Sequence, residues 1–403
     1  MKFSNENERM QHPQARLLPL GVWNAFYSKE LSSFQLTLMQ TASIDLGNYL
    51  AGLDREALQD LIITKNKYTD WLAMAYSHPD ITDDLLMNLA DRLNLSDEQF
   101  FFLAAVIGRC SLMERLIALA PDKVQAMIAE DNYEAFRWAA DNGHLPVMEL
   151  LMELAPDKVQ DMIAADDYCA FRYAANNGHL PVMERLIALA PDKEQDMIAA
   201  DDYSAFHMAA DSGHLPVMER LMELAPDKVQ DMIAARNYGA FHMATDSGHL
   251  PVMERFIALA PDKVQDMIAA NNYEAFSGAA YNGHLPVMEC LMELAPDKVQ
   301  DMIAANNYEA FRYAAHNGHL PVMERLMELA PDTVQNMIAA GNDSVRYAAF
   351  RGAANNGHLL VVNRLLTFPS VFAYAAMHQR EYGEKYVHPF IDMRIIALQE
   401  GQS

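Results

Sequence analysis

The apolar residues between positions 132 and 165 are spaced as in helices, and the pattern recurs along the chain. Phe136, Ala139, Ala140 and Gly143 lie at positions i, i+3, i+4 and i+7, so they share one face of a helix. Repetition of such a segment predicts a solenoid, in which each unit buries its apolar face against its neighbours. The period is 35 residues, which is the spacing between successive Gly-His pairs. A seventh pair, Gly357-His358, follows after 39 residues, and Gly108-Arg109 precedes the first pair by 35. The regularly spaced pairs are Gly143-His144, Gly178-His179, Gly213-His214, Gly248-His249, Gly283-His284 and Gly318-His319.

Each unit carries the signals of three helices. The first, at residues 134–142, ends at Gly143, because glycine readily adopts the left-handed conformation that stops a helix. The second, at residues 145–154, has a proline in its first turn, where proline is tolerated. The third, at residues 156–165, begins with Pro-Asp, in which proline fixes the entry and aspartate complements the helix dipole. The sequence therefore predicts an all-α chain.

The repeats divide the chain into four segments. We predict a non-repeat helical region at residues 1–52, a degenerate capping repeat at 53–99, regular units at 100–340, and a final irregular repeat with a C-terminal cap at 341–403. Ser96, followed by Asp-Glu-Gln, forms the signature of a capping box that opens a helix. Irregular end units are expected of a solenoid, because the outer side of a terminal unit has no neighbour.

The first two helices of each unit resemble the ankyrin-repeat family. Residues 134–153, EAFRWAADNGHLPVMELLME, match the family pattern T-P-L-H-x-A-A-x-x-G-H-x-x-V-V-x-x-L-L at Ala139-Ala140, Gly143-His144, Val147 and Leu151. The resemblance covers about three quarters of the chain. It implies an ankyrin-like helical repeat solenoid with N- and C-terminal helical caps, in which the first helices line a concave groove.

One part of the unit departs from the family pattern. Ankyrin units continue into a β-hairpin, whereas residues 154–168 read LAPDKVQDMIAADDY and favour a helix. We therefore expect a short third helix in place of the hairpin. Long, Pro-Asp-rich units of this kind are similar to ankyrin effectors of intracellular bacteria, and that similarity implies delivery into a host cell.

Comparison of the units with one another separates two faces of the first helix. Residues 135, 136, 139, 140 and 143 and their equivalents hardly change, whereas residues 134, 137, 138 and 141 change from unit to unit. Tryptophan, tyrosine and arginine, which dominate interface energetics, are frequent among the changing residues. Drift on a solvent-facing surface would also produce variation. We predict that the partner-binding residues are Glu134, Arg137, Trp138, Asp141, Arg172, Tyr173, Asn176, His207, Met208, Asp211, His242, Met243, Asp246, Tyr281, Arg312, Tyr313 and His316.

The charge of the chain narrows the class of partner. The formal net charge is −25 and the pI is near 4.8. Nucleic-acid binding requires a basic stripe, which the sequence lacks. The acidity favours solubility of an extended array or a protein partner with a basic surface. The sequence has no run of 18 apolar residues and no apolar signal peptide, so we expect a cytoplasmic protein without a membrane span.

The repeated histidines invite a metal interpretation that their spacing does not support. Zinc needs converging ligands, whereas equivalent residues of stacked units are separated by a helix spacing. We interpret the histidines as hydrogen-bond partners of the turn backbone. The acidic pairs Asp166-Asp167 and Asp201-Asp202 are replaced by Arg236-Asn237 and Asn271-Asn272 in other units, which favours loop solvation. Cys169 has no catalytic companions. We predict no metal, no cofactor and no catalytic residue.

These observations favour a monomeric protein–protein interaction module or scaffold that binds a partner protein in the groove of the first helices. An alternative is an effector or modifying enzyme, in which residues 1–95 act on a target that the repeats recruit. A third possibility is an array without a ligand. The irregular ends and the four extra residues before Tyr347 argue against that third possibility.

Overall fold

The computed structural model describes residues 95–341 and 347–377, together with residues 83, 84, 86, 87 and 90. The chain forms two compact parts, residues 1–197 and residues 198–403, and each part is described by itself. The predicted non-repeat region at residues 1–52 lies outside the described residues, as do most of the predicted capping repeat and the last 26 residues, 378–403.

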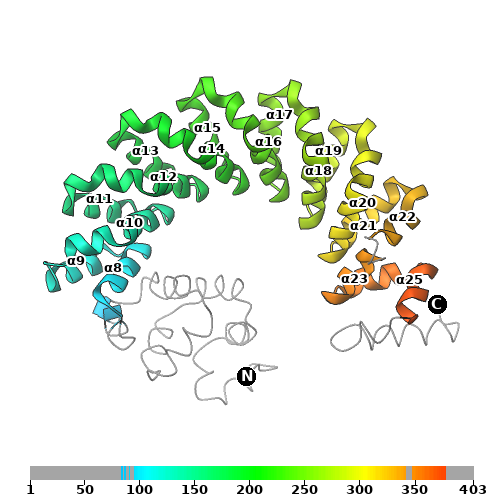
Figure 1. The fold of residues 1–403 in the computed structure, drawn as a ribbon, viewed down its shortest axis with the longest axis horizontal. Coiled ribbons are helices and arrows are strands. Elements are labelled where there is room, and N and C mark those ends of the chain that lie inside the picture. Colours follow the sequence, from blue (N-terminus) through cyan, green and yellow to red (C-terminus); the bar gives the residue numbers. More distant parts are fainter. Residues whose placement is uncertain (1–82, 85, 88–89, 91–94, 342–346, 378–403) are drawn as a thin grey trace, which may run out of the picture. The chain divides into compact units, whose positions relative to one another are not determined.

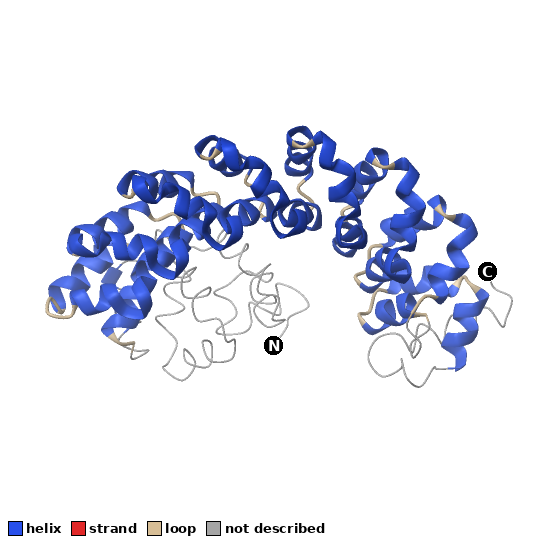
Figure 2. Cartoon of the chain, turned by 45° about the horizontal axis from the view of Figure 1, so that its top comes forward, coloured by secondary structure: helices blue, strands red, loops and turns tan. Residues whose placement is uncertain are grey.

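Long and short helices alternate in both parts (Figures 1 and 2), and the described residues contain no strand. The short helices are the predicted second helices, and within each part they form one layer while the long helices form the other. The long helices are α10 (Val124–Asp141), α12 (Val159–Asn176), α14 (Glu194–Asp211), α16 (Val229–Asp246), α18 (Val264–Asn282) and α20 (Val299–His316). The short helices are α9 (Cys110–Leu119), α11 (Leu145–Leu154), α13 (Leu180–Leu189), α15 (Leu215–Leu224), α17 (Leu250–Leu259), α19 (Leu285–Leu294) and α21 (Leu320–Leu329).

Short 3-10 helices follow the second helices because Pro-Asp-Lys starts a new helix with a tight turn. They are η2 (Pro156–Lys158), η3 (Pro191–Lys193), η4 (Pro226–Lys228), η5 (Pro261–Lys263), η6 (Pro296–Lys298) and η7 (Pro331–Thr333). The remaining helices lie near the ends of the described residues: α8 (Asp97–Val106), α22 (Val334–Ala339), α23 (Ala348–Asn355), α24 (Leu359–Leu366) and α25 (Pro369–Met377). Ser96 and Gln99 form the predicted capping box of α8, in which each side chain bonds the backbone nitrogen of the other residue.

A left-handed turn divides every long helix into two segments. In α12, Ala165 is extended, and Asp166, Asp167 and Tyr168 then take φ values of 48°, 56° and 55°. The segment before the turn is the predicted third helix, and the segment after it is the first helix of the next unit. The same turn occurs in all six long helices. The expected third helix is therefore confirmed, and it continues into the next unit through this turn.

The constant face of each first helix forms the core. Ala139 and Ala140 are fully buried, and their small side chains allow neighbouring helices to pack closely. One phenylalanine per unit fills the space between the helices, and burial of such a side chain contributes about 2 kcal/mol. The phenylalanines of this column are at most 1% exposed: Phe101, Phe136, Phe171, Phe206, Phe241, Phe276, Phe311 and Phe350.

Each Gly-His pair joins two successive units. His144 Nε2 lies 3.0 Å from the carbonyl oxygen of Val106, at the end of the preceding first helix, and donates to it because a carbonyl only accepts. His179 bonds the backbone of Asp141 in the same way. Gly143 has a φ of +73°, and a Cβ atom built on it would lie 2.6 Å from Nδ1 of His179. The histidines thus bind the turn of the preceding unit, whereas the sequence did not distinguish that turn from their own. We call this arrangement the Gly–His contact.

The Gly143→Ala substitution tests the Gly–His contact. We expect it to lower the free energy of unfolding by about 2 kcal/mol or more, because alanine is disfavoured at positive φ and its Cβ would collide with His179. Thermal unfolding followed by circular dichroism measures the loss. The double variant Gly143→Ala/His179→Ala should lose less than the sum of the two single losses, since removal of the imidazole relieves the collision. Strict additivity of the two losses would contradict this account.

Candidate partner-binding surface

The candidate surface consists of the outward positions of the first helices, which follow the left-handed turn in each long helix. In the part at residues 1–197 it comprises Glu134, Arg137, Trp138, Asp141, Arg172, Tyr173 and Asn176. In the part at residues 198–403 it comprises His207, Met208, Asp211, His242, Met243, Asp246, Tyr281, Arg312, Tyr313 and His316. We call these residues the first-helix surface of each part. Most of them are half-buried between neighbouring helices, and Asp211, Tyr281 and His316 are exposed.

Two predicted contact residues lie inside the protein. His207 is 0% exposed and His242 is 5% exposed, so neither side chain is accessible to a partner. Burial and the neighbouring Arg236 guanidinium lower the pKa of His207 to about 4, so its ring is neutral at pH 7. The expectation that these two histidines contact a partner directly is therefore corrected. Their position on the helix turns them toward the adjacent unit.

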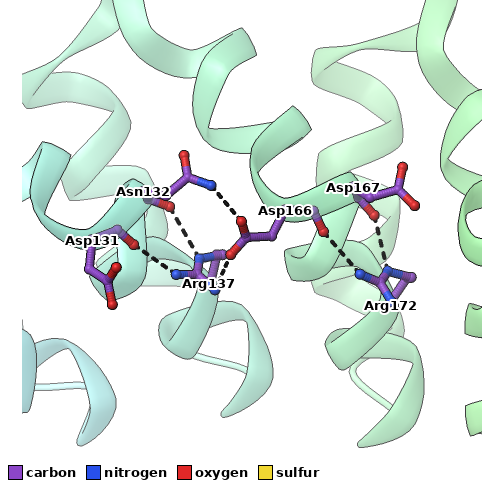
Figure 3. A network of polar contacts seen from close by, with 6 residues as sticks. All are labelled: Asp131, Asn132, Arg137, Asp166, Asp167 and Arg172. Atoms are coloured by element: carbon purple, nitrogen blue, oxygen red, sulfur yellow. Dashed lines mark hydrogen bonds and ion pairs between the residues drawn. The ribbon is translucent and has the colours of Figure 1, made fainter.

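The predicted contact arginines support the left-handed turns (Figure 3). Arg137 donates from Nε to the carbonyl of Asn132 at 3.1 Å and from Nη2 to the carbonyl of Asp131 at 2.8 Å. Arg172 bonds the carbonyls of Asp167 and Asp166 at 3.0 and 2.9 Å. A left-handed residue other than glycine is unfavourable by about 1–2 kcal/mol, so a turn with three of them depends on such contacts.

Arg137 also connects neighbouring turns. Arg137 Nη1 forms an ion pair with Asp166 Oδ2 at 2.5 Å, and Asn132 Nδ2 donates to the other oxygen of that carboxylate at 2.7 Å. Arg312 supports its own turn as Arg172 does, with bonds of 3.0 Å to the carbonyls of Asn307 and Asn306. The sequence predicted these arginines only as partner-binding residues, whereas in the structure their guanidinium groups bond the carbonyls of the left-handed turns.

A different arginine supports the turn where the first helix carries His207. Arg236, in the turn of the following unit, donates from Nη2 to the carbonyl of Asp201 at 2.6 Å. It also forms ion pairs with the side chains of Asp201 and Asp202, at 3.1 and 3.7 Å. The sequence indicates that Arg236 takes over this role. Arg236 stands where the other units carry aspartate or asparagine, and it lies in the unit after His207, which is the first histidine to replace the first-helix arginine.

Aromatic side chains provide the apolar contribution to the surface. In the first part, Trp138 packs edge-to-face against Phe102, with ring centroids 6.3 Å apart. In the second part, Tyr281 and Tyr313 pack edge-to-face at 5.3 Å, and Tyr281 is 43% exposed. Edge-to-face pairs are worth about 0.5–1.5 kcal/mol beyond the area that they bury. The rings are therefore held in fixed orientations beside polar residues.

The aspartates at the ends of the first helices differ in their hydrogen bonding. Asp141 Oδ1 accepts from Asn177 Nδ2 at 2.7 Å, and Asp211 Oδ1 accepts from Ser247 Oγ at 2.8 Å. Asp246 Oδ1 is buried and has no hydrogen-bond partner. It occupies the space beside Gly278, where a Cβ atom would lie only 1.7 Å from it. Burial, then Glu274, then Asp211 raise the pKa of Asp246 to about 7.

The surface offers no arrangement for metal or thiol chemistry among the residues that the structure describes. These residues include no group of three or more His, Cys, Asp or Glu side chains that could hold a metal ion. Cys169 is buried. Burial raises the pKa of Cys110 and of Cys290, which makes both thiols weak nucleophiles at neutral pH.

No single helix of the described residues is long and apolar enough to cross a membrane. Helices α24 and α25 pass a test of length and apolar composition only when taken together, and they are bent by 112° relative to each other.

The Gly278→Ala substitution tests the packing of Asp246. Alanine normally stabilises a helix by about 1 kcal/mol relative to glycine. Here we expect Gly278→Ala to destabilise the protein, because the new methyl group would overlap Asp246 Oδ1. In an Asp246→Ala background the same substitution should become stabilising. Chemical unfolding of the four proteins measures this reversal of sign, and a stabilising effect of Gly278→Ala in both backgrounds would show that the two side chains do not compete for space.

One comparison with known proteins, with a family model, agrees with the repeat pattern. The family model described as ankyrin repeats (3 copies) matches residues 138–232 and 171–268. A solved structure of an ankyrin repeat family protein from Legionella pneumophila is 25% identical, covering 93% of this chain and 99% of its own, with a TM-score of 0.38. No curated protein matches the chain. The matched units carry the same Gly-His pairs and buried alanines as the rest of the array, and the chain contains ankyrin repeats at residues 138–268.

Proposed function

We propose that this chain binds another protein through a groove lined by its first helices and acts as an adaptor, scaffold or inhibitor. Ankyrin repeats are generally protein–protein interaction modules, which gives the class of function. The proposal also includes four finer points: the site lies on the first-helix surface, the partner has a basic surface, the protein acts as a monomer, and it acts in the cytoplasm. The net charge of −25 supports the basic partner.

The observation that carries the proposal is the difference between two accessible surfaces. Most exposed residues of the second helices and of the following 3-10 helices are nearly constant from unit to unit, as Pro146, Asp157 and Lys158 and their equivalents illustrate, and the exposed position 153 changes only between glutamate and alanine. Positions 138 and 141 of the first helices, which are also accessible, change in almost every unit. Drift after duplication would alter both surfaces. Concentrated change on one surface indicates adaptation to a ligand.

The residue types on the changing surface fit a protein ligand. Trp138, Tyr173, Tyr281 and Tyr313 combine large apolar area with a polar tip, which is typical of residues that dominate binding energy. The carboxylates of Asp141 and Asp211 lie at the C-terminal ends of the first helices in α10 and α14. An aromatic surface beside acidic groups suits a partner that presents apolar and basic side chains.

The alternative of an enzyme in residues 1–95 falls almost entirely outside the described residues. Such an activity would add to the first-helix surface, which would still recruit the target. We therefore keep binding as the proposed function of the repeats.

Substitution of the aromatic residues tests the proposal. A partner is first identified by affinity capture with mass spectrometry, and its Kd is then measured with purified proteins. We expect Tyr281→Ala and Tyr313→Ala together to weaken binding at least about tenfold, because buried interface tyrosines often contribute more than 1–2 kcal/mol. Asp227→Ala together with Lys228→Ala, on the constant surface, is the matched control and should leave the Kd unchanged. Equal effects of the two double variants would refute the proposed site, provided that both variants keep the wild-type circular dichroism spectrum.

A further inference from the structure

The packing of α16 against α18 contains an acidic group in an unusual environment. Asp246, the last residue of α16, points its Oδ1 atom into the space left by Gly278 of α18, and that atom is buried without a hydrogen-bond partner. The Asn282 amide, which stands where Asn177 stands beside Asp141, donates to the backbone carbonyl of Asp246 at 2.8 Å. An ionised carboxylate oxygen without a donor is strongly unfavourable when buried, whereas a neutral carboxyl group is tolerated.

The charged groups that face Asp246 are acidic. Glu274 approaches from α18, and Asp211 approaches from α14, and both act to disfavour ionisation of Asp246. The Asp211 carboxylate accepts a hydrogen bond from Ser247, the residue that follows Asp246. The arginine of the same helix, Arg236, lies at the left-handed turn in the middle of α16 and is engaged there with two other aspartates. Three carboxyl groups from three successive first helices therefore surround one helix end without a cation among them.

A histidine beside Glu274 completes the cluster. His242 Nε2 lies 3.3 Å from the carbonyl oxygen of Met267 and must donate to it, because the carbonyl has no proton. The other ring nitrogen, Nδ1, lies 3.3 Å from Glu274 Oε2. A hydrogen bond between these two atoms requires one further proton, either on the ring or on the carboxyl group. Burial lowers the pKa of His242 and Glu274 opposes this effect, so the imidazole carries a second proton less readily than a free imidazole does.

We propose that the packing of α16 against α18 is sensitive to protonation: a neutral Asp246 keeps the two helices closely packed, and an ionised Asp246 loosens them. This inference concerns the fold of the repeats and does not depend on the identity of a partner. Because Asp246 also belongs to the first-helix surface, its ionisation changes the charge and the local order of that surface together.

The direction of the pH dependence follows from linkage. The pKa of Asp246 is about 7 in the folded protein, above its ordinary value of 3.8. A carboxyl group whose pKa is raised by folding contributes stability that is fully present below its unfolded pKa and is lost as the pH rises through its folded pKa. Close packing of α16 and α18 is therefore favoured at pH 5 and weakened by pH 7 to 8.

The neighbouring packing of α18 against α20 provides an internal control. Tyr281 takes the place of the aspartate there, and it packs edge-to-face against Tyr313 of α20 at a centroid distance of 5.3 Å. The residue of α20 that corresponds to Gly278 is Tyr313, which carries a full side chain where Gly278 has none. The α18–α20 contact therefore repeats the fold of the α16–α18 contact with an aromatic pair in place of the buried carboxyl group.

Hydrogen–deuterium exchange of the full chain between pH 5 and pH 8 tests the proposal. The exchange of α16 amides is expressed relative to that of α20 amides, which removes the intrinsic pH dependence of exchange. In the wild type this ratio should rise about fiftyfold between pH 5 and pH 7 and level off above pH 7. In Asp246→Asn it should stay constant, since asparagine has the same shape and does not ionise. A constant ratio in the wild type, or an equal rise in Asp246→Asn, would overturn the proposal.

A second variant keeps the test decisive if Asp246→Asn does not fold. Glu274→Gln retains Asp246 and removes the stronger of the two charges that oppose its ionisation. The rise in the exchange ratio should then occur at a lower pH than in the wild type. An unchanged midpoint in Glu274→Gln would show that Asp246 is not the group that titrates.

Discussion

The stacking of successive units depends on the contact between a glycine and the histidine of the next unit. The imidazole lies against a glycine that has left-handed dihedral angles, as His179 lies against Gly143. Its Nε2 atom donates a hydrogen bond to the last turn of the preceding first helix, as His144 does to the carbonyl of Val106. A larger side chain at the glycine would displace the ring and lose the hydrogen bond. The contact thus fixes both the distance and the register of neighbouring units, and the buried alanines and phenylalanines fill the space that remains.

The left-handed turns impose the second constraint on each unit. Three consecutive left-handed residues, such as Asp166, Asp167 and Tyr168, are unfavourable by themselves, and an arginine bonds their carbonyls in the units that carry one on the first helix. This requirement competes with binding, because the same arginines extend from the first helix. The aromatic residues and the aspartates are less constrained by the turn, and they remain as the main candidates for contact with a partner.

The sequence predicted the helices and the buried face, because each depends on residues at fixed spacing within one unit. It also predicted that the histidines of the Gly-His pairs bond the backbone of a turn, but not that this turn belongs to the preceding unit. It did not predict the burial of His207 and His242 or the role of the arginines, since both depend on the path of the turn backbone. The sequence also did not predict the buried environment of Asp246. That environment depends on Gly278, which lies 32 residues further along the chain but next to Asp246 in space. Among these features, only the support of the turn by Arg236 is indicated in the sequence, by the change from aspartate or asparagine to arginine at that position.

Photo-crosslinking from defined positions tests most directly whether the first-helix surface binds a partner. Benzoylphenylalanine placed at Tyr281, on the first helix of its unit, is compared with the same residue at Glu254, which is exposed on the second helix α17. With the partner identified by affinity capture, the account predicts covalent adducts from position 281 and none above background from position 254. Adducts from position 254 alone, or equal yields from both positions, would contradict it.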